Sequence, residues 1–382
     1  MKARVALLAA VVLAAVVAGV ARAGEEAIDW ERARALLQKE NQRQPLTPEE
    51  QAYLNRAREA RGRTVTPPSP PKESWGLTPL TDMGAGTYKG ETGGLYGEGS
   101  NVPPPAQRKA AEAACARIRP LDAAGRPSPD GRIVLISIGM SNTTQEFSMF
   151  KRMADADAAK SPAVLIVDGA QGAQDASAWA RAEETFPPDR PSPWKVLDDR
   201  LKQAGATPQQ VQAVWLKQAL AGPSSLGEFP AHARRLQQDV VTALNAARKR
   251  FPNLQIAYLS SRIYAGYATT PLNPEPFAYE GAFAMRWVIQ AQIAGEPQLN
   301  ADPARGEVRA PVVLWGPYLW TDGTTPRKPD GLVWKQEDCG QDGTHPSESG
   351  RRKVAALLLE FLKSDFSAAP WFAPAPQTPR TG

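Results

Sequence analysis

Ser141 and the pair Asp342 and His345 are residues of the types that acyl transfer needs, and the pair has a suitable spacing. Ser141 ends a Gly-x-Ser turn after an apolar run, and Asp342 precedes His345 by three residues. Acyl transfer uses a nucleophile, a base that takes its proton and a group that orients the base. The other histidine, His232, falls in a charged helical stretch with no carboxylate at a helpful spacing, so we interpret it as a surface residue. The sequence therefore predicts an ester hydrolase with Ser141 as nucleophile, His345 as base and Asp342 as the orienting group.

Five short apolar runs, separated by amphipathic stretches, predict the sheet that must position these residues. Continuous rather than alternating apolarity marks strands that are buried on both faces. The runs are 133–138, 163–167, 211–216, 255–259 and 311–315. The helical stretches between and after them are 146–159, 194–204, 231–250, 280–294 and 347–362. This alternation predicts an α/β fold, a three-layer α/β/α flavodoxin-like sandwich with a five-stranded parallel sheet.

The candidate residues all follow the carboxyl ends of these predicted strands. Ligands of open parallel sheets bind in the crevice outside that edge. Ser141 follows the first run, Gly172 the second and Gln218 the third. Asp342 and His345 lie between the fifth run and the last helix. We therefore expect one site at this edge, formed by segments that are distant in the sequence.

Two short motifs resemble blocks of the SGNH (GDSL-like) hydrolase superfamily. The turn at 139–141 resembles its first block, although Met140 stands where that block usually has aspartate. The segment Asp-Gly-Thr-His-Pro-Ser at 342–347 resembles its last block. The resemblance covers about residues 129–365 and does not extend to residues 24–128. It implies a serine hydrolase that uses the Ser-His-Asp triad named above.

The same resemblance implies an oxyanion hole. Its second block supplies a glycine, best matched by Gly172, with Gly169 as the other choice, beside the backbone N–H of Ser141. The third block usually reads G-x-N-D, but this chain has Lys217-Gln218 after the third strand. The Gln218 carboxamide takes the place of the asparagine in this hypothesis; alternatively, it is simply a polar residue at a strand end. Losing one oxyanion donor costs on the order of a hundredfold in rate, so this departure bears on efficiency rather than on reaction class.

The N-terminal segment has the pattern of an export signal. Lys2 and Arg4 precede an apolar run over 5–21. Ala21-Arg22-Ala23 then gives an A-x-A cleavage site. We therefore interpret residues 1–23 as a signal peptide. The expected protein is exported, periplasmic or extracellular, without stable membrane insertion after signal removal. An uncleaved N-terminal anchor is the alternative.

Composition divides the rest of the chain into segments. A capping box, Thr47-Pro48-Glu49-Glu50, predicts the second helix of a helical hairpin. The segments are the helical hairpin at 24–65, a Pro-rich linker at 66–74, a Gly/Pro-rich loop segment at 75–128 that packs on the main domain, the hydrolase domain at 129–368 and a Pro-rich tail at 369–382.

Charge and the supply of metal ligands exclude several classes of partner. Without residues 1–23 the chain has 42 Lys and Arg against 40 Asp and Glu, which gives no basic face for nucleic acid. No cluster of Cys, His and carboxylate residues is visible, so we expect no metal and no cofactor and disfavour a metal-dependent hydrolase. Cys115 and Cys339 either form a disulfide in an oxidising compartment or stay as two free buried thiols.

Aromatic residues in the predicted loops suggest the substrate. Because Trp and Tyr faces stack on sugar rings, and because the superfamily includes exported polysaccharide deacetylases, we expect a small-molecule or carbohydrate ester, with an acetylated carbohydrate as the leading choice. Ordinary packing is the alternative for these side chains. A catalytically weak glycan- or envelope-binding protein is the alternative function, and the sequence indicates no oligomeric state. The aromatic residues are Trp179, Trp194, Tyr264, Tyr267, Trp315, Tyr318, Trp320 and Trp334.

Overall fold

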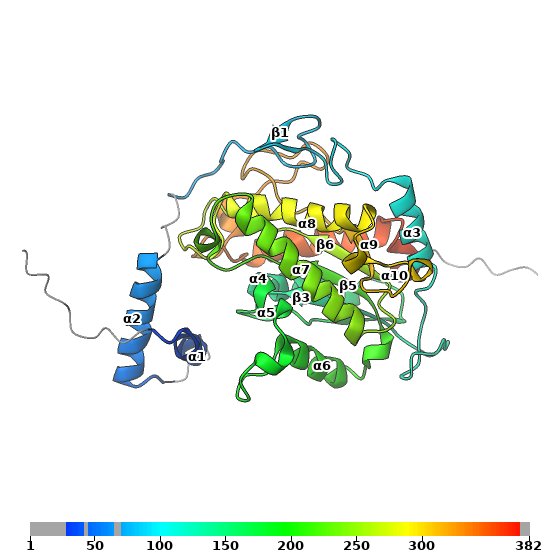
Figure 1. Ribbon diagram of the computed structural model, residues 1–382, viewed down its shortest axis with the longest axis horizontal. Helices are drawn as coiled ribbons and strands as arrows, with labels where there is room; N and C mark the ends of the chain where they lie inside the picture. The colour runs from blue at the N-terminus through cyan, green and yellow to red at the C-terminus, as the bar shows by residue number, and fades with distance from the viewer. Residues whose placement is uncertain (1–27, 42–44, 65–69, 375–382) are drawn as a thin grey trace, which may run out of the picture. The chain divides into compact units, whose positions relative to one another are not determined.

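The computed structural model describes residues 28–41, 45–64 and 70–374 of the 382-residue chain (Figure 1). The chain divides after Thr64 into two compact units. The predicted signal peptide, residues 1–23, lies outside the described residues. Among the helices of the described part, none is both long enough and apolar enough to cross a membrane.

Two helices form the N-terminal unit. They are α1 (Trp30–Asn41) and α2 (Pro48–Thr64), which pack on each other through a small apolar core. The capping box is formed at the start of α2. The Thr47 hydroxyl accepts the N–H of Glu50 at 3.2 Å, and the Glu50 carboxylate accepts the N–H of Thr47 at 2.8 Å. The predicted helical hairpin is therefore confirmed.

The second unit contains a five-stranded parallel sheet flanked by helices. Its strands are β3 (Ile133–Gly139), β4 (Val164–Val167), β5 (Val211–Lys217), β6 (Ile256–Ser260) and β7 (Val312–Trp315). Its helices are α3 (Pro105–Cys115), α4 (Ser141–Asp155), α5 (Ala176–Ala180), α6 (Pro193–Gln203), α7 (Ala231–Arg250), α8 (Phe277–Ile293), α9 (Glu348–Ser364) and α10 (Ala369–Phe372). The five strands lie within two residues of the five apolar runs.

The strand order brings the candidate segments together. The order is β4-β3-β5-β6-β7, with every neighbouring pair parallel. In chain order this is 2-1-3-4-5, the flavodoxin-like arrangement. Gly139 lies opposite Lys217, and Lys217 lies opposite Ser260, so β3, β5 and β6 end at the same level. The predicted three-layer α/β/α fold is confirmed.

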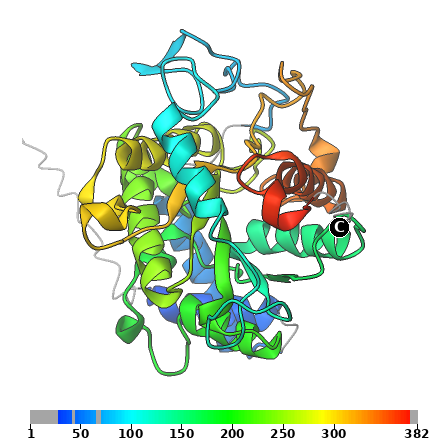
Figure 2. The same ribbon diagram turned by 90° about the vertical axis from the view of Figure 1, so that its right-hand side faces the viewer.

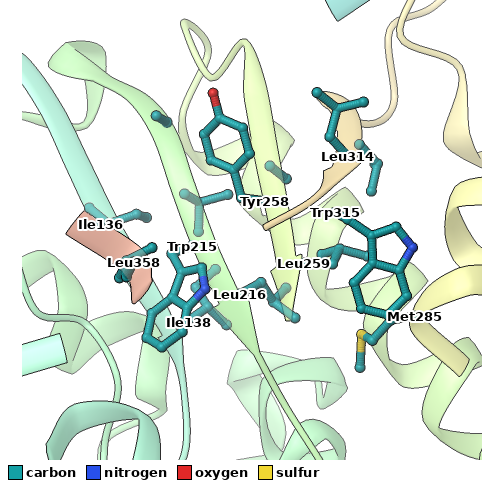
Figure 3. Close-up of a cluster of buried hydrophobic side chains, with 14 of the residues drawn as sticks. Ile136, Ile138, Trp215, Leu216, Tyr258, Leu259, Met285, Leu314, Trp315 and Leu358 are labelled. Atoms are coloured by element: carbon teal, nitrogen blue, oxygen red, sulfur yellow. The ribbon is translucent and has the colours of Figure 1, made fainter. Parts of the chain in front are cut away.

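Helices cover both faces of the sheet. Figure 2 shows α7 and α8 on one side of the sheet, and α4 with α9 on the other. Large side chains fill the space between sheet and helices, and Figure 3 shows part of this core. Trp215 of β5 stacks on Phe147 of α4 at 5.7 Å between ring centroids, and Tyr258 of β6 meets Phe361 of α9 edge-on at 5.1 Å. Burying a side chain of this size contributes about 2–3 kcal/mol, so the sheet is a firm platform for its loops.

The Gly-rich segment before α3 is an ordered loop on α8. It contains a short antiparallel hairpin, β1 (Thr87–Tyr88) and β2 (Glu91–Thr92). Arg286 of α8 pairs with the Glu91 carboxylate at 2.5 Å, and Trp287 donates to the same carboxylate at 3.0 Å. Hydrogen bonds to side chains of α8 therefore hold this loop in place.

Candidate active site

The structure brings Ser141, His345 and Asp342 together at the carboxyl edge of the sheet. Ser141 is the first residue of α4, separated from the end of β3 at Gly139 by Met140 alone, and the other two lie between β7 and α9. The Ser141 hydroxyl lies 2.7 Å from Nε2 of His345, and Nδ1 of His345 lies 2.6 Å from Oδ2 of Asp342. With Asp342 ionised, Nδ1–H donates to the carboxylate and Nε2 is left to accept the serine proton. This is the geometry of nucleophile, general base and orienting group.

Asp342 is held as a carboxylate by its own loop. Its Oδ1 accepts the backbone N–H groups of Thr344 and His345, both at 3.0 Å. Burial alone would raise the pKa of Asp342, but the hydrogen bonds from the His345 ring and from the two backbone N–H groups outweigh burial and lower that pKa to about 2. The group that orients His345 is therefore negatively charged at neutral pH.

A glycine allows this loop its tight turn. Gly343 has a φ of +63°, and a Cβ at this position would lie 1.8 Å from the carbonyl oxygen of Tyr267. The loop is closed by a hydrogen bond at 2.7 Å from the N–H of Gly340 to the carbonyl of His345. Ser347 then caps α9 by accepting the N–H of Gly350. The Asp-Gly-Thr-His-Pro-Ser motif thus encodes a turn, a triad pair and a helix start.

The turn that carries Ser141 is equally constrained. A Cβ on Gly139 would lie 2.4 Å from the side chain of Thr143, so only glycine fits beneath the first turn of α4. The Thr143 hydroxyl donates to the carbonyl of Lys217 at 2.8 Å and so anchors α4 on the end of β5. Met140 occupies the N-cap position without a side-chain cap, so Ser141 lies at a helix N-terminus where backbone N–H groups favour negative charge.

The two candidate glycines of the second strand differ in their surroundings. The N–H of Gly169 already donates to the Ser137 hydroxyl at 3.0 Å, and a Cβ there would lie 2.5 Å from the Ser137 carbonyl oxygen. Gly172 is exposed, and a Cβ there would meet nothing within 4 Å. The neighbouring Gln171 donates its N–H to the carbonyl of Gly139 at 3.1 Å, which ties this turn to the one that precedes Ser141.

The Gln218 carboxamide is committed elsewhere in this structure. Gln218 is 2% exposed, and its Nε2 lies 3.5 Å from the carbonyl oxygen of Gln174, a long hydrogen bond. Its Oε1 is buried and has no hydrogen-bond partner among the described residues. A second buried amide lies beside Ser141: Asn142 is 1% exposed, and its Nδ2 has no acceptor in the described part of the chain. Its position next to Ser141 was the only sequence signal for it.

His232 is not a surface residue, which corrects the sequence interpretation. It is 2% exposed, and its Nε2 lies 2.7 Å from a carboxylate oxygen of Glu280. Tyr88 and Lys89 donate to the other oxygen of that carboxylate at 2.6 and 2.9 Å. The partner lies 48 residues away on another helix, so no local spacing could reveal it. His345, not His232, is the histidine bonded to a serine.

The two cysteines are free and buried, so the disulfide alternative is wrong for this structure. Cys115 ends α3, where burial and the nearby Asp365 raise the pKa of its thiol. Cys339 lies in the triad loop near Arg262 and Asp338, and burial raises its thiol pKa to about 12. The two side chains have different neighbours, and both stay protonated at neutral pH.

The aromatic residues named as candidates for sugar stacking are packing residues instead. All eight are buried, the most exposed at 5%. Their polar groups also bond internally: the indole N–H of Trp179 donates to the Gly139 carbonyl at 3.2 Å, and that of Trp194 donates to the Trp179 carbonyl at 3.0 Å. Trp179 and, through it, Trp194 therefore support the turn that precedes Ser141. Among the described residues, no group of three or more His, Cys, Asp or Glu could hold a metal ion.

A shallow recess borders the triad loop. Its volume is about 250 Å³, and it is lined by uncharged groups: Tyr267, Thr269, Gln336, Cys339, Gly340, Gln341 and Gly343. Gln341 and Gly343 flank Asp342 in the chain, so one wall of the recess is the triad loop, while the side chains of Ser141, His345 and Asp342 lie outside the lining. The neutral lining suits an uncharged, hydrogen-bonding ligand.

No protein-family model matches the chain, and no curated protein matches it in sequence. Two solved structures show a weak likeness. A gut microbial diltiazem-metabolizing enzyme aligns with 13% identity and a TM-score of 0.30 over 60% of this chain and 46% of its own. The salicylyl-acyltransferase of a tetracycline biosynthetic pathway aligns with 13% identity and a TM-score of 0.28 over 61% of this chain and 54% of its own. The chain therefore spans about half the length of each of these enzymes.

Proposed function

We propose that this protein is an exported serine esterase of the SGNH type. The observation that carries the proposal is the unbroken chain of hydrogen bonds from Ser141 through His345 to Asp342, at 2.7 and 2.6 Å. The first and last motif blocks and the 2-1-3-4-5 strand order support the SGNH assignment. The signal-peptide pattern of residues 1–23 supports export to the periplasm or the extracellular space.

The geometry supports a two-step mechanism. Ser141 attacks the ester carbonyl while Nε2 of His345 takes its proton, and the same nitrogen then protonates the leaving alcohol. Asp342 stabilises the imidazolium that forms between these events. Water, activated by His345, hydrolyses the acyl-enzyme and regenerates the serine.

The oxyanion is held by backbone donors in this proposal. The N–H groups of Ser141 and Gly172 are the expected donors, at the start of α4 and in the exposed turn after β4. A single donor of this kind contributes about 3–4 kcal/mol to the transition state. Gln218 would have to turn its carboxamide away from Gln174 before it could add a third hydrogen bond.

The recess on the triad loop is the proposed contact for an uncharged part of the substrate, because Gly343, the residue after Asp342, lines it. Its lining contains two carboxamides, the hydroxyls of Thr269 and Tyr267, the Cys339 thiol and glycine backbone, and burial raises the pKa values of Tyr267 and Cys339 to about 12. Such groups suit a hydroxyl-rich molecule, so an acetylated carbohydrate or another small neutral ester is the proposed substrate class. Release of acetate from acetylated oligosaccharides, compared with turnover of longer acyl esters, tests this choice.

The esterase proposal is tested by Ser141→Ala, with Ser364→Ala as a control at an exposed site near the end of α9. We expect the first variant to lose hydrolysis of p-nitrophenyl acetate by roughly 10⁴-fold or more and to lose labelling by a fluorophosphonate probe. The control should behave as the wild type, and both variants should unfold at the wild-type temperature. Equal turnover by Ser141→Ala would disprove the assignment of the nucleophile.

A second candidate function is glycan or envelope binding by a catalytically weak protein of the same fold. The observation that favours it is the commitment of the Gln218 nitrogen to Gln174, which leaves the oxyanion hole one side-chain donor short. The same fluorophosphonate experiment distinguishes the two functions. A wild-type protein that binds a glycan but resists the probe would be a binding protein.

A further inference from the structure

A buried arginine lies behind the triad loop. Arg262 follows the end of β6 by two residues and is 2% exposed. Its Nη2 donates to the carbonyl oxygen of Thr344 at 2.8 Å. Thr344 lies between Asp342 and His345, so this hydrogen bond holds the middle of the segment that presents the base.

Burying the Arg262 guanidinium costs free energy that its surroundings must offset. A guanidinium has five N–H donors, yet one hydrogen bond is formed to the protein from Nη2, and Nε is buried with no acceptor among the described residues. Burial lowers the pKa of Arg262, and nearby carboxylates, led by Glu146 and Glu275, oppose the change. A buried charge is retained only when its surroundings compensate it. Its charged and titratable neighbours are Lys217 of β5, Glu146 of α4, Glu275 before α8, and Cys339 and Asp342 of the triad loop.

The same charged cluster also supports the nucleophile. Lys217 and Glu146 form an ion pair at 2.6 Å with both side chains fully buried. Glu146 belongs to α4, the helix that begins at Ser141, and Lys217 ends the strand on which Thr143 is anchored. One set of buried charges therefore underlies both the helix of the nucleophile and the loop of the base.

We propose that Arg262 is a positioning residue that fixes the triad loop, through the Thr344 carbonyl, so that His345 meets both Ser141 and Asp342. The inference rests on the proposed esterase function. Arg262 touches neither the serine nor the imidazole in the hydrogen bonds described, so it acts through the backbone of the loop. A small displacement of a catalytic base is enough to lower the rate, since about 1 Å costs roughly a hundredfold.

The chain offers a matched control in Arg286. This residue of α8 is 1% exposed, has a buried Nε without an acceptor in the described part of the chain, and also donates to backbone carbonyls, those of Thr92 and Gly94. Its loop is the β1–β2 segment and not the triad loop. Arg262→Gln and Arg286→Gln therefore each remove a buried cation and its hydrogen bonds to the backbone of a loop, and the two loops differ. Arg286→Gln also removes the ion pair with Glu91, so it is the more severe structural change of the two.

The experiment compares Arg262→Gln, Arg262→Lys and Arg286→Gln with the wild type in hydrolysis of p-nitrophenyl acetate. We expect Arg262→Gln to lower kcat about tenfold to a hundredfold with little change in KM. Arg262→Lys, which keeps a donor and the charge, should recover most of that loss. Arg286→Gln should keep the wild-type kcat even where its melting temperature falls. A loss of kcat in Arg286→Gln equal to that in Arg262→Gln would show a general structural effect and overturn the proposal.

A spectroscopic measurement separates this proposal from the esterase assignment. The short hydrogen bond from Nδ1 of His345 to Asp342 should give a low-field proton resonance in the NMR spectrum, assigned by its loss in His345→Gln. We expect Arg262→Gln to shift or broaden that resonance and Arg286→Gln to leave it unchanged. An unchanged resonance in Arg262→Gln would refute the positioning role even for a wild type without esterase activity. A wild type without activity, but with the shifted resonance in the variant, would refute the esterase function alone.

Discussion

At the scale of single residues, one carboxylate organises a whole loop. Asp342 accepts two backbone N–H groups on one oxygen and the His345 ring on the other. The position of the ring and the path of the backbone are therefore set by the same group. Gly343 makes this compact arrangement sterically feasible, since its φ of +63° and its contact with Tyr267 exclude a side chain.

The low pKa of Asp342 predicts a specific loss of stability in acid. Its pKa is about 2 in the folded protein, below the ordinary value of 3.8. The unfolded chain therefore takes up this proton at higher pH than the folded protein does. The contribution is fully present above about pH 5 and is lost as pH falls from about 4 to about 2, and it amounts to about 2 kcal/mol.

Urea unfolding of the wild type and of Asp342→Asn from pH 5 to pH 2 measures this contribution. The free energy of unfolding of the wild type should fall more steeply through this range than that of the variant. Other carboxylates titrate in both proteins and cancel in the comparison. Parallel pH dependences would mean that Asp342 is not held in the charged form by the fold.

At the scale of elements, a buried ion pair joins α4, the helix that begins at Ser141, to the sheet. Lys217 ends β5, Glu146 lies in the second turn of α4, and neither side chain is exposed. Burial lowers the pKa of Lys217 to about 8, with Glu146 acting in the opposite direction. The pair therefore compensates two charges that would be costly to bury alone.

Removing one partner of this pair should be far worse than removing both. We expect Lys217→Met to lower the free energy of unfolding by about 3–5 kcal/mol, because it leaves Glu146 buried and unpaired, and the double variant with Glu146→Leu to recover much of that loss. The exposed pair Lys195–Asp199 of α6, at 56% and 52% exposure, is the control and should cost less than about 1 kcal/mol when Lys195 is replaced by Met. Urea unfolding measures all three. Equal costs for the buried and the exposed pair would contradict this account.

Strands were easier to predict from the sequence than helix starts. Buried parallel strands are continuous apolar runs, so their limits are visible in the residues. The helix after β3 was predicted from residue 146, yet α4 begins at Ser141, because Met140 at the N-cap gives no capping signal. Helix α3 lies within the segment 75–128 that was predicted to be a loop, and its Pro105 start is hidden among other prolines.

The supports of the site could not be predicted in the same way as the triad. Ser141, Asp342 and His345 follow from local motifs and from the carboxyl ends of strands. Whether a polar residue near a strand end is buried depends on the helices that cover it, which local sequence does not reveal. For that reason the sequence indicates neither the ion pair of Lys217 nor the burial of Arg262, and it leaves open whether Gln218 is an oxyanion donor or a polar residue at a strand end.

At the scale of the whole molecule, every hydrogen bond described for the site comes from the second unit. The chain divides after Thr64, and the triad, its loop and the charged cluster all lie beyond residue 130. A protein that lacks residues 1–64 should therefore hydrolyse p-nitrophenyl acetate with kcat/KM within about a factor of two of the wild type. A loss of tenfold or more, at an unchanged melting temperature, would show that the N-terminal unit takes part in the reaction.

Ser141 and His345 are 204 residues apart in the sequence, which determines when the site can assemble during synthesis. During synthesis Ser141 is made long before His345. In the proposed mechanism neither residue is catalytic without the other. In the proposed mechanism the Ser141 hydroxyl becomes nucleophilic only when β3, β5, β6 and β7 have paired and the loop before α9 has formed. If the protein is the proposed esterase, an unfolded or partly synthesised chain has no activity, and completion of the fold is the step that activates it.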